Sequence, residues 1–344
     1  MKLRLAVLAL IILQMGVAEF VVANDIPYVF SPSGLTNDLS QQTVRQIHQD
    51  HRGYLWILTQ EGLNRYDGRA IKIYRSEANN PSTLSENYTR GMLEDSKGNL
   101  WIATYGGGLN LYIAETDTFE SIQKSRQTVR SPLSDRIWTI NKGLEDKMWV
   151  GYRDGGFSAF DPATRLFRHY TSERWPILGD APIIDIEQDK DGIVWIATRG
   201  NGLLKLDTER DSIELVAAKS GAKYTLSSNM ISDVHRDRSD YLWISTFDGG
   251  LYRIFRDDEI LRPVRKVLNP SAIELDPDKE KESLKVHRIY EDAQDRIFLA
   301  TNNGVGIFHP DIQSIEMFTP KNSELSQNRV LSIYQDRTGR YWIG

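Results

Sequence analysis

The chain has 344 residues, of which 40% are apolar, so it is long enough for one large or two ordinary domains. Its 42 basic and 47 acidic residues give a net charge of -5 and form no long block of one sign, which argues against nucleic acid as a partner. The absence of cysteine excludes disulfides, thiolate metal sites and cysteine nucleophiles.

The first 23 residues differ from the rest of the chain. Basic residues precede an apolar run over 5–13, and small apolar residues stand just before residue 24, where a signal peptidase would cut. A retained membrane anchor needs about 20 apolar residues, and Gln14 and Glu19 interrupt the run too early. We therefore predict a signal peptide over 1–23 and a periplasmic mature chain over 24–344.

A five-residue sequence, LWIAT at 100–104, and six variants of it give seven copies along the chain. Each copy has a large aromatic residue at its second position. These anchors are Trp56, Trp101, Trp149, Trp195, Trp243, Phe298 and Trp342. Successive anchors are 45, 48, 46, 48, 55 and 44 residues apart. Self-similarity at this period indicates a solenoid, a propeller or an array.

Each repeat is predicted to contain four short strands joined by tight turns. In the first repeat, Val44 and Ile47 are followed by Asp50 and by a turn that contains Gly53. Aspartate can cap such a turn through its carboxylate and glycine supplies a positive φ, so the turn indicates a hairpin. Four antiparallel strands in each repeat of this length are typical of a propeller blade.

We predict an all-β fold, a seven-bladed β-propeller of four-stranded antiparallel blades whose last blade is incomplete in this chain. One blade cannot bury both of its faces, so the blades must stack, and the anchor aromatics are expected to be core rather than ligand platforms. We expect the domain over 24–344 to be truncated at its C-terminal end and residues 27–30 to close the ring. The long spacing before the sixth anchor predicts a solvated loop over 256–283.

These repeats resemble those of the two-component regulator propeller family. The first repeat reads DHRGYLWILT followed by GLNRYD within 50–67, and leucine followed by Ser-x-Asn recurs at 84–87, 226–229 and 325–328. The resemblance covers about residues 27–344. Single turns depart from the pattern: Gly143 stands where an acid is expected, Asp295 where glycine is expected, and Phe298 where tryptophan is expected.

The resemblance implies the periplasmic sensor portion of a bacterial membrane signalling protein. In such proteins a transmembrane helix joins the sensor to a cytoplasmic histidine kinase or diguanylate cyclase, so the full-length protein is expected to be anchored in the inner membrane. The implied partners are a small-molecule or oligosaccharide ligand and downstream signalling domains of the same polypeptide. A homodimer is left open.

Positions that differ between repeats at one structural level are free to carry a site. Loops before the first strand and after the second strand emerge together around the mouth of the central channel, where propellers usually bind ligands. Aromatic rings there offer faces for stacking, and arginines and amides offer planar donors for hydroxyl or carboxylate groups. The predicted ligand-binding residues are Arg45, Arg90, Tyr105, Trp138, Arg153, Arg199, Phe247, His287 and Asn302. Any one of them could instead only satisfy neighbouring backbone or acidic groups.

No motif for catalysis or metal binding stands out. The six histidines are scattered over different repeats, and no metalloprotease, nucleophile-elbow or phosphate-loop motif occurs. We therefore expect no catalytic residue, no metal and no cofactor in this chain. A propeller hydrolase or lyase acting on glycans remains an alternative, because it would need an acid and a base in the channel. Its candidates are Glu61, Asp154, Asp248 and His287. A protein-interaction scaffold is the other alternative.

Overall fold

The computed structural model describes residues 28–31, 33–35, 37–126, 128–216, 226, 228–255, 261–264, 266–267 and 284–344. Residues 31–344 form one compact unit, whose fold is described below. The predicted signal peptide over 1–23 lies outside the described residues. The described part is built from strands and two short 3₁₀ helices, η1 (Thr128–Arg130) and η2 (Pro176–Leu178). It contains no helix long and apolar enough to cross a membrane.

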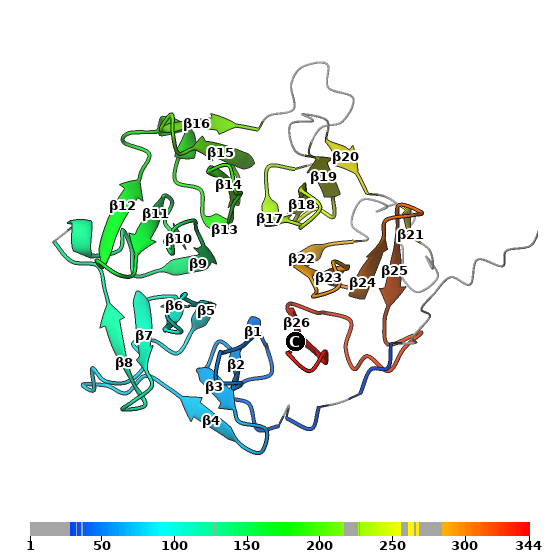
Figure 1. Ribbon diagram of the computed structural model, residues 1–344, viewed down its shortest axis with the longest axis horizontal. Helices are drawn as coiled ribbons and strands as arrows, with labels where there is room; N and C mark the ends of the chain where they lie inside the picture. The colour runs from blue at the N-terminus through cyan, green and yellow to red at the C-terminus, as the bar shows by residue number, and fades with distance from the viewer. Residues whose placement is uncertain are drawn as a thin grey trace, which may run out of the picture. The chain divides into compact units, whose positions relative to one another are not determined.

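Six sheets surround a common centre, and the first strand of each lies innermost (Figure 1). Blade 1 contains β1 (Gln46–Gln49), β2 (Leu55–Leu58), β3 (Leu63–Tyr66) and β4 (Ile71–Tyr74). Blade 2 contains β5 (Thr89–Glu94), β6 (Leu100–Thr104), β7 (Leu109–Ile113) and β8 (Thr118–Ile122). Blade 3 contains β9 (Ile137–Lys142), β10 (Met148–Tyr152), β11 (Phe157–Asp161) and β12 (Leu166–Tyr170).

The second half of the chain continues this order. Blade 4 contains β13 (Ile183–Gln188), β14 (Ile193–Thr198), β15 (Leu203–Asp207) and β16 (Ser212–Leu215). Blade 5 contains β17 (Ile231–Arg236), β18 (Tyr241–Thr246), β19 (Leu251–Phe255) and β20 (Arg262–Pro263). Blade 6 contains β22 (Val286–Glu291), β23 (Ile297–Thr301), β24 (Gly304–His309) and β25 (Ser314–Phe318). A final hairpin pairs β26 (Ile333–Gln335) with β27 (Tyr341–Ile343).

The predicted all-β propeller of four-stranded antiparallel blades is confirmed, but the predicted number of blades is wrong. The described residues form six blades rather than seven, because the seventh repeat contributes only the hairpin β26–β27. This hairpin lies between blade 6 and blade 1 (Figure 1). Residues 28–30 form no strand, so the structure does not show the predicted closing strand there.

The predicted surface loop over 256–283 is partly wrong. Within it, β20 pairs with β19 and supplies the fourth strand of blade 5. The two-residue strand β21 (Lys266–Val267) pairs in parallel with β25 and extends the outer edge of blade 6. Residues 256–260, 265 and 268–283 lie outside the described residues.

The turn between the first two strands of a blade is organised by an aspartate. In blade 1, Asp50 Oδ1 accepts hydrogen bonds from the backbone N–H groups of Arg52 (3.0 Å) and Tyr54 (2.9 Å), and Oδ2 accepts one from Trp56 Nε1 (2.9 Å). The turn ends at Gly53, whose φ of 93° favours glycine. The same aspartate–indole bond recurs in three other repeats, as Asp95–Trp101 (3.1 Å), Asp237–Trp243 (2.6 Å) and Asp336–Trp342 (2.8 Å).

In two repeats that depart from this pattern, a residue of the neighbouring repeat supplies the missing hydrogen-bond partner. In blade 3, where Gly143 replaces the aspartate, Gln188 Oε1 of blade 4 accepts hydrogen bonds from Trp149 Nε1 (2.9 Å) and from the Leu144 N–H (2.9 Å). In blade 6, where Phe298 replaces tryptophan, Asp292 Oδ2 accepts a hydrogen bond from the Tyr341 hydroxyl of the hairpin. Blade 4 is different, since the buried Trp195 Nε1 has no hydrogen-bond partner.

The anchor aromatics are core, as predicted. The anchor side chains of the six blades are at most 9% exposed. Each lies on the second strand of its blade, and this strand is buried on both faces. Burial on both faces explains why the second strand is a nearly continuous apolar run. Each anchor packs toward the next blade. Ring centroids are 4.8 Å apart for Trp56 and Tyr112, and 5.1 Å apart for Trp101 and Phe160. The hydrophobic core is therefore divided into layers, each shared by two blades.

The last residue of an inner strand binds the aspartate turn of the preceding blade. Glu94 accepts a hydrogen bond from the His51 N–H (3.0 Å), and Glu291 accepts one from the Arg238 N–H (3.0 Å). The hairpin makes the same bond on both sides. These bonds are Gln335 Oε1 with the Ala293 N–H (3.1 Å) and Gln49 Oε1 with the Arg337 N–H (2.9 Å). The hairpin is thus joined to blade 6 and to blade 1 by the same kind of hydrogen bond that joins complete blades.

We predict that Asp50 and Trp56 are energetically coupled. Asp50→Asn keeps a turn acceptor but loses the charged acceptor of the indole N–H, and we expect it to lower the free energy of unfolding by about 1–2 kcal/mol. Trp56→Phe should cost less in the Asp50→Asn background than in the wild type. Urea unfolding of the two single variants and the double variant measures the coupling. Asp311→Asn, at an exposed turn acid, is the control, and strictly additive effects would contradict the prediction.

Candidate functional site

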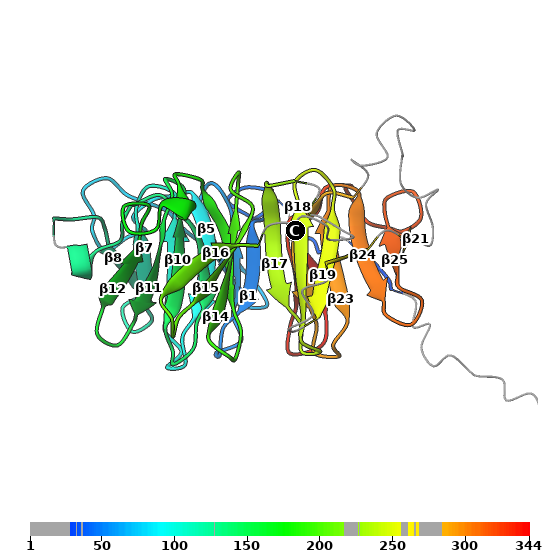
Figure 2. The ribbon, with the colours of Figure 1, turned by 90° about the horizontal axis from the view of Figure 1, so that it is seen from above.

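The strands run between two loop-bearing faces (Figure 2). We call one of them the mouth face. There the first strand of each blade begins and the second strand ends. In blade 2, Thr89 pairs with Thr104 and Gly91 pairs with Ala103, so Arg90 is the extra residue of a β-bulge. The same bulge position holds Trp138, Ile184, Ser232 and His287 in blades 3 to 6. A bulge changes the direction in which a side chain points. This position can therefore hold residues that are not needed for strand pairing.

Five of the predicted residues gather on the mouth face of blades 1 to 3. We call this group, with Tyr88, the mouth cluster; its members are Arg45, Tyr88, Arg90, Tyr105, Trp138 and Arg153. The Arg90 guanidinium lies 3.9 Å from the centroid of the Trp138 ring, and that of Arg153 lies 5.8 Å from it. The Tyr105 ring lies 5.9 Å from Trp138 and 5.3 Å from Tyr88. An edge-to-face ring contact and a cation–π contact therefore cross the boundary between blades 2 and 3.

Sequence analysis did not identify Tyr88, which holds the cluster together. Its hydroxyl oxygen accepts hydrogen bonds from Arg45 Nη2 (3.4 Å), Arg90 Nη1 (3.3 Å) and Gln60 Nε2 (3.3 Å). It also did not identify Arg136, which donates to the Tyr105 hydroxyl (2.7 Å). Both residues stand 13 positions before an anchor, so comparing that position across the repeats would have found them.

The other predicted residues lie outside this cluster. The Arg199 guanidinium is 5.0 Å from the Phe247 ring centroid, so these two form a separate pair across blades 4 and 5. Asn302 Oδ1 accepts a hydrogen bond from the Lys285 N–H (3.0 Å), which is a structural role. His287 is half-buried, and its Nε2 has no hydrogen-bond partner. Burial, together with the nearby positive charges of Arg329 and Arg45, lowers the pKa of His287 to about 4.

Two of the residues considered for catalysis, Asp154 and His287, belong to different blades. Asp154 forms an ion pair with Arg136 (2.7 Å) and accepts a hydrogen bond from Ser134 (2.6 Å). It belongs to blade 3, whereas His287 belongs to blade 6 on the other side of the centre (Figure 1). The described residues also contain no group of three or more histidine or acidic side chains that could hold a metal ion.

A buried charge cluster joins the inner strands of blades 4 to 6. Arg288 Nη1 lies 3.2 Å from Asp233 Oδ1 and 3.8 Å from Asp185 Oδ1, and both acids are 2% exposed. Asp233 Oδ2 also accepts a hydrogen bond from the Ile289 N–H (2.7 Å). Burial raises the pKa of Asp233 well above its usual value, and Asp233 raises the pKa of Arg288. The two acids are buried, whereas the Arg288 side chain is 41% exposed, and the cluster links three blades.

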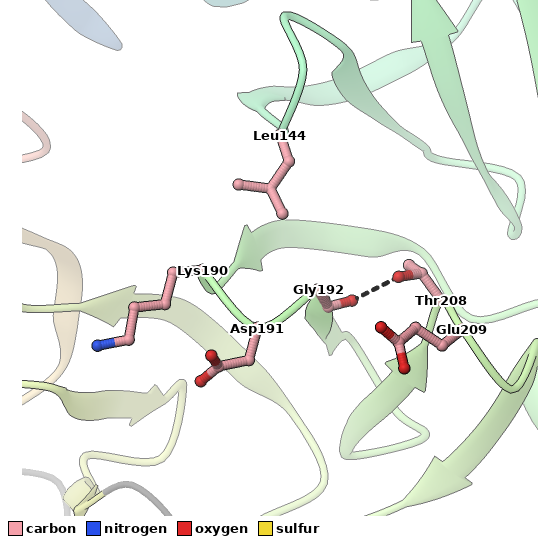
Figure 3. A pocket seen from close by; sticks show the side chains of 6 residues that line it. All are labelled: Leu144, Lys190, Asp191, Gly192, Thr208 and Glu209. Carbon is pink, nitrogen blue, oxygen red and sulfur yellow. Dashed lines mark hydrogen bonds between the residues drawn. The ribbon is translucent and has the colours of Figure 1, made fainter.

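A depression of about 520 Å³ lies on the opposite face (Figure 3). It is lined by Leu144, Lys190, Asp191, Gly192, Thr208 and Glu209. Two of these residues are engaged in local structure. Thr208 Oγ1 donates to the Gly192 carbonyl (2.8 Å), and Lys190 pairs with Asp240 (3.1 Å). The depression has no aromatic side chain, so the mouth cluster is the better candidate for ligand recognition.

Four segments of the chain match the family model for the two component regulator propeller, at 38–61, 83–106, 177–200 and 324–344. The predicted resemblance to this family is therefore confirmed. A histidine kinase from Formosa agariphila, "Histidine kinase P4", is 28% identical over 174 residues, which cover 49% of this chain and 12% of that protein.

Two solved structures share the fold. The extracellular domain assigned to a hybrid two component system of B. thetaiotaomicron has a TM-score of 0.78 and 24% identity, covering 92% of this chain and 40% of that chain. PorZ, a surface component of the type-IX secretion system of Porphyromonas gingivalis, has a TM-score of 0.66 and 16% identity, covering 92% and 46%. The chain thus spans less than half of each of these relatives.

We predict that the charge of Glu187, beside the buried charge cluster, costs stability at neutral pH. Burial raises the pKa of Glu187 to about 7, from a usual value of 4.5. A raised pKa favours folding below pH 4.5, and that contribution is lost as the pH rises through 7. Glu187→Gln should therefore be more stable than the wild type at pH 8, by roughly 1–3 kcal/mol, and equally stable at pH 4.5. Urea unfolding at both pH values, with Glu209→Gln as control, measures this; an equal difference at both values would contradict it.

Proposed function

We propose that this chain, which carries repeats of the two-component regulator propeller family, is the extracytoplasmic ligand-sensing module of a bacterial membrane signalling protein. The output would be that of a histidine kinase or a diguanylate cyclase elsewhere in the same polypeptide. The export signal expected over 1–23 supports a periplasmic location. So do the relatives, because one is a histidine kinase and another is the extracellular domain of a hybrid two component system.

The observation that carries the proposal is the mouth cluster. Tyr105 and Trp138 belong to adjacent blades, and Arg90 stacks on Trp138 across the same boundary. Arg90 and Trp138 stand at β-bulges where the first strands begin, and none of the cluster residues is an anchor of the layered core. Half-buried aromatic and arginine side chains in one place on a rigid scaffold are typical of a recognition surface.

The arrangement suggests how binding would be transmitted. A ligand that contacts blades 1 to 3 at once would favour the blade packing in which those contacts are all made. Blade packing is set by hydrogen bonds between inner strands and the turns of preceding blades, such as Glu94 with His51 (3.0 Å). A small change in packing at the mouth would therefore be carried to the opposite face through the strands themselves.

An enzyme is the less favoured reading of the same surface. The acid Asp154 is held by Arg136 and Ser134, and the base candidate His287 stands across the ring from it. We propose that this chain binds its ligand without converting it.

We predict that removing the mouth side chains abolishes ligand-dependent stabilisation. The test variant carries four alanine substitutions, at Arg45, Tyr105, Trp138 and Arg199. Thermal-shift measurements on the full chain, against a panel of oligosaccharides and organic acids, should show one or more compounds that raise the Tm of the wild type but not that of the variant. Lys190→Ala, in the depression on the opposite face, should respond as the wild type does. An unchanged response of the fourfold variant would refute the placement of the site.

A further inference from the structure

The arginines of the mouth cluster have no acidic partners. Arg45, Arg90 and Arg153 make no ion pair within the described part of the chain, whereas arginines elsewhere on the same blades do. Arg52 pairs with Asp50 (3.0 Å) and Arg65 pairs with Asp117 (3.2 Å). The mouth is therefore a local concentration of positive charge on a chain whose net charge is -5.

These arginines also have too few acceptors. The Tyr88 oxygen accepts hydrogen bonds from both Arg45 and Arg90, and both bonds are long, at 3.4 Å and 3.3 Å. The Nε atoms of both arginines are buried and have no hydrogen-bond partner. Unsatisfied buried donors cost free energy, so this arrangement is unfavourable without an added acceptor.

The positive charges of Arg45 and Arg90 also repel each other. Burial and the charge of Arg45, against the raising effect of Tyr88, together lower the pKa of Arg90 to about 10. Arg90 nevertheless remains charged at neutral pH. Two adjacent cations that are partly buried are expected where a bound anion offsets them.

We propose that the mouth cluster recognises an organic carboxylate, with its charged group at Arg45 and Arg90 and a cyclic body against Tyr105 and Trp138. The proposal rests on the proposed sensing function and narrows its ligand to an anion. Guanidinium groups match a carboxylate in plane and in hydrogen-bond geometry, and the two rings supply the apolar faces that a cyclic ligand needs. Tyr88 then positions both guanidinium groups.

A first test needs no ligand. If Arg45 and Arg90 are retained for an anion, the double variant Arg45→Gln/Arg90→Gln loses their mutual repulsion and should have the same Tm as the wild type, or a higher one. Arg288→Gln, which leaves the buried Asp185 and Asp233 without their cation, should lower the Tm. A lower Tm for the mouth double variant would show that its arginines hold the fold, and would overturn the proposal.

The second test uses three probes on the full chain. Isothermal titration with D-glucuronate, D-glucose and succinate separates the charge from the ring, because glucuronate has both, glucose has only the ring and succinate has only the charge. We expect glucuronate to bind, glucose not to bind, and succinate to bind more weakly. Each single variant, Arg45→Gln and Arg90→Gln, should weaken glucuronate binding at least 10-fold. Arg168→Gln, which removes an outer ion pair with Asp211, should leave it unchanged.

The outcomes separate the two proposals. If glucose binds as well as glucuronate, or if neither carboxylate binds, the anion proposal is overturned. The sensing function would then still stand if any neutral compound of the wider panel raised the Tm of the wild type and not that of the fourfold mouth variant. The sensing function is overturned together with the anion proposal only if no compound of the panel raises the Tm of the wild type in this way.

Discussion

The fold depends on one local interaction, the hydrogen bonding of a turn carboxylate to backbone N–H groups and to an indole N–H six residues later. One oxygen of Asp50 closes the turn between β1 and β2, and the other fixes the ring of Trp56. The ring can then fill the space against Tyr112 of the next blade. Hydrogen bonds to a charged acceptor contribute more than neutral ones, and here a single group links turn, strand and interblade core.

The same interaction explains how irregular repeats are tolerated. Where blade 3 lacks the aspartate, Gln188 of the next blade accepts the bond from Trp149. Where blade 6 lacks tryptophan, Asp292 binds Tyr341 of the hairpin instead. Each replacement transfers the bond from within a repeat to the boundary between two repeats. These bonds across repeat boundaries add to those that already join inner strands to the turns of preceding blades, such as Glu94 with His51.

Periodicity in the sequence predicted the blades and their anchors, because each repeat must bury the same aromatic residue. It predicted a seventh blade with a missing part, of which the structure contains only a hairpin, and it did not predict the two-residue strands β20 and β21, which are too short to leave a pattern in the sequence. At the mouth it identified Arg90 and Trp138 but also Asn302, whose amide serves the local backbone. Tyr88 was missed because only the position 11 residues before each anchor was compared at the start of the first strands, and Tyr88 stands two residues earlier.

The account requires that a ligand binds at the mouth face, so the strongest protection on binding must be found there. Hydrogen exchange of the full chain with and without D-glucuronate tests this most directly. The account predicts the strongest slowing of exchange in segments around residues 45, 88–90, 105 and 138, and a smaller change in the turns at 190–192 and 208–209 that border the depression. Slower exchange in those turns alone, or unchanged exchange throughout a chain shown to be saturated with the compound, would contradict it.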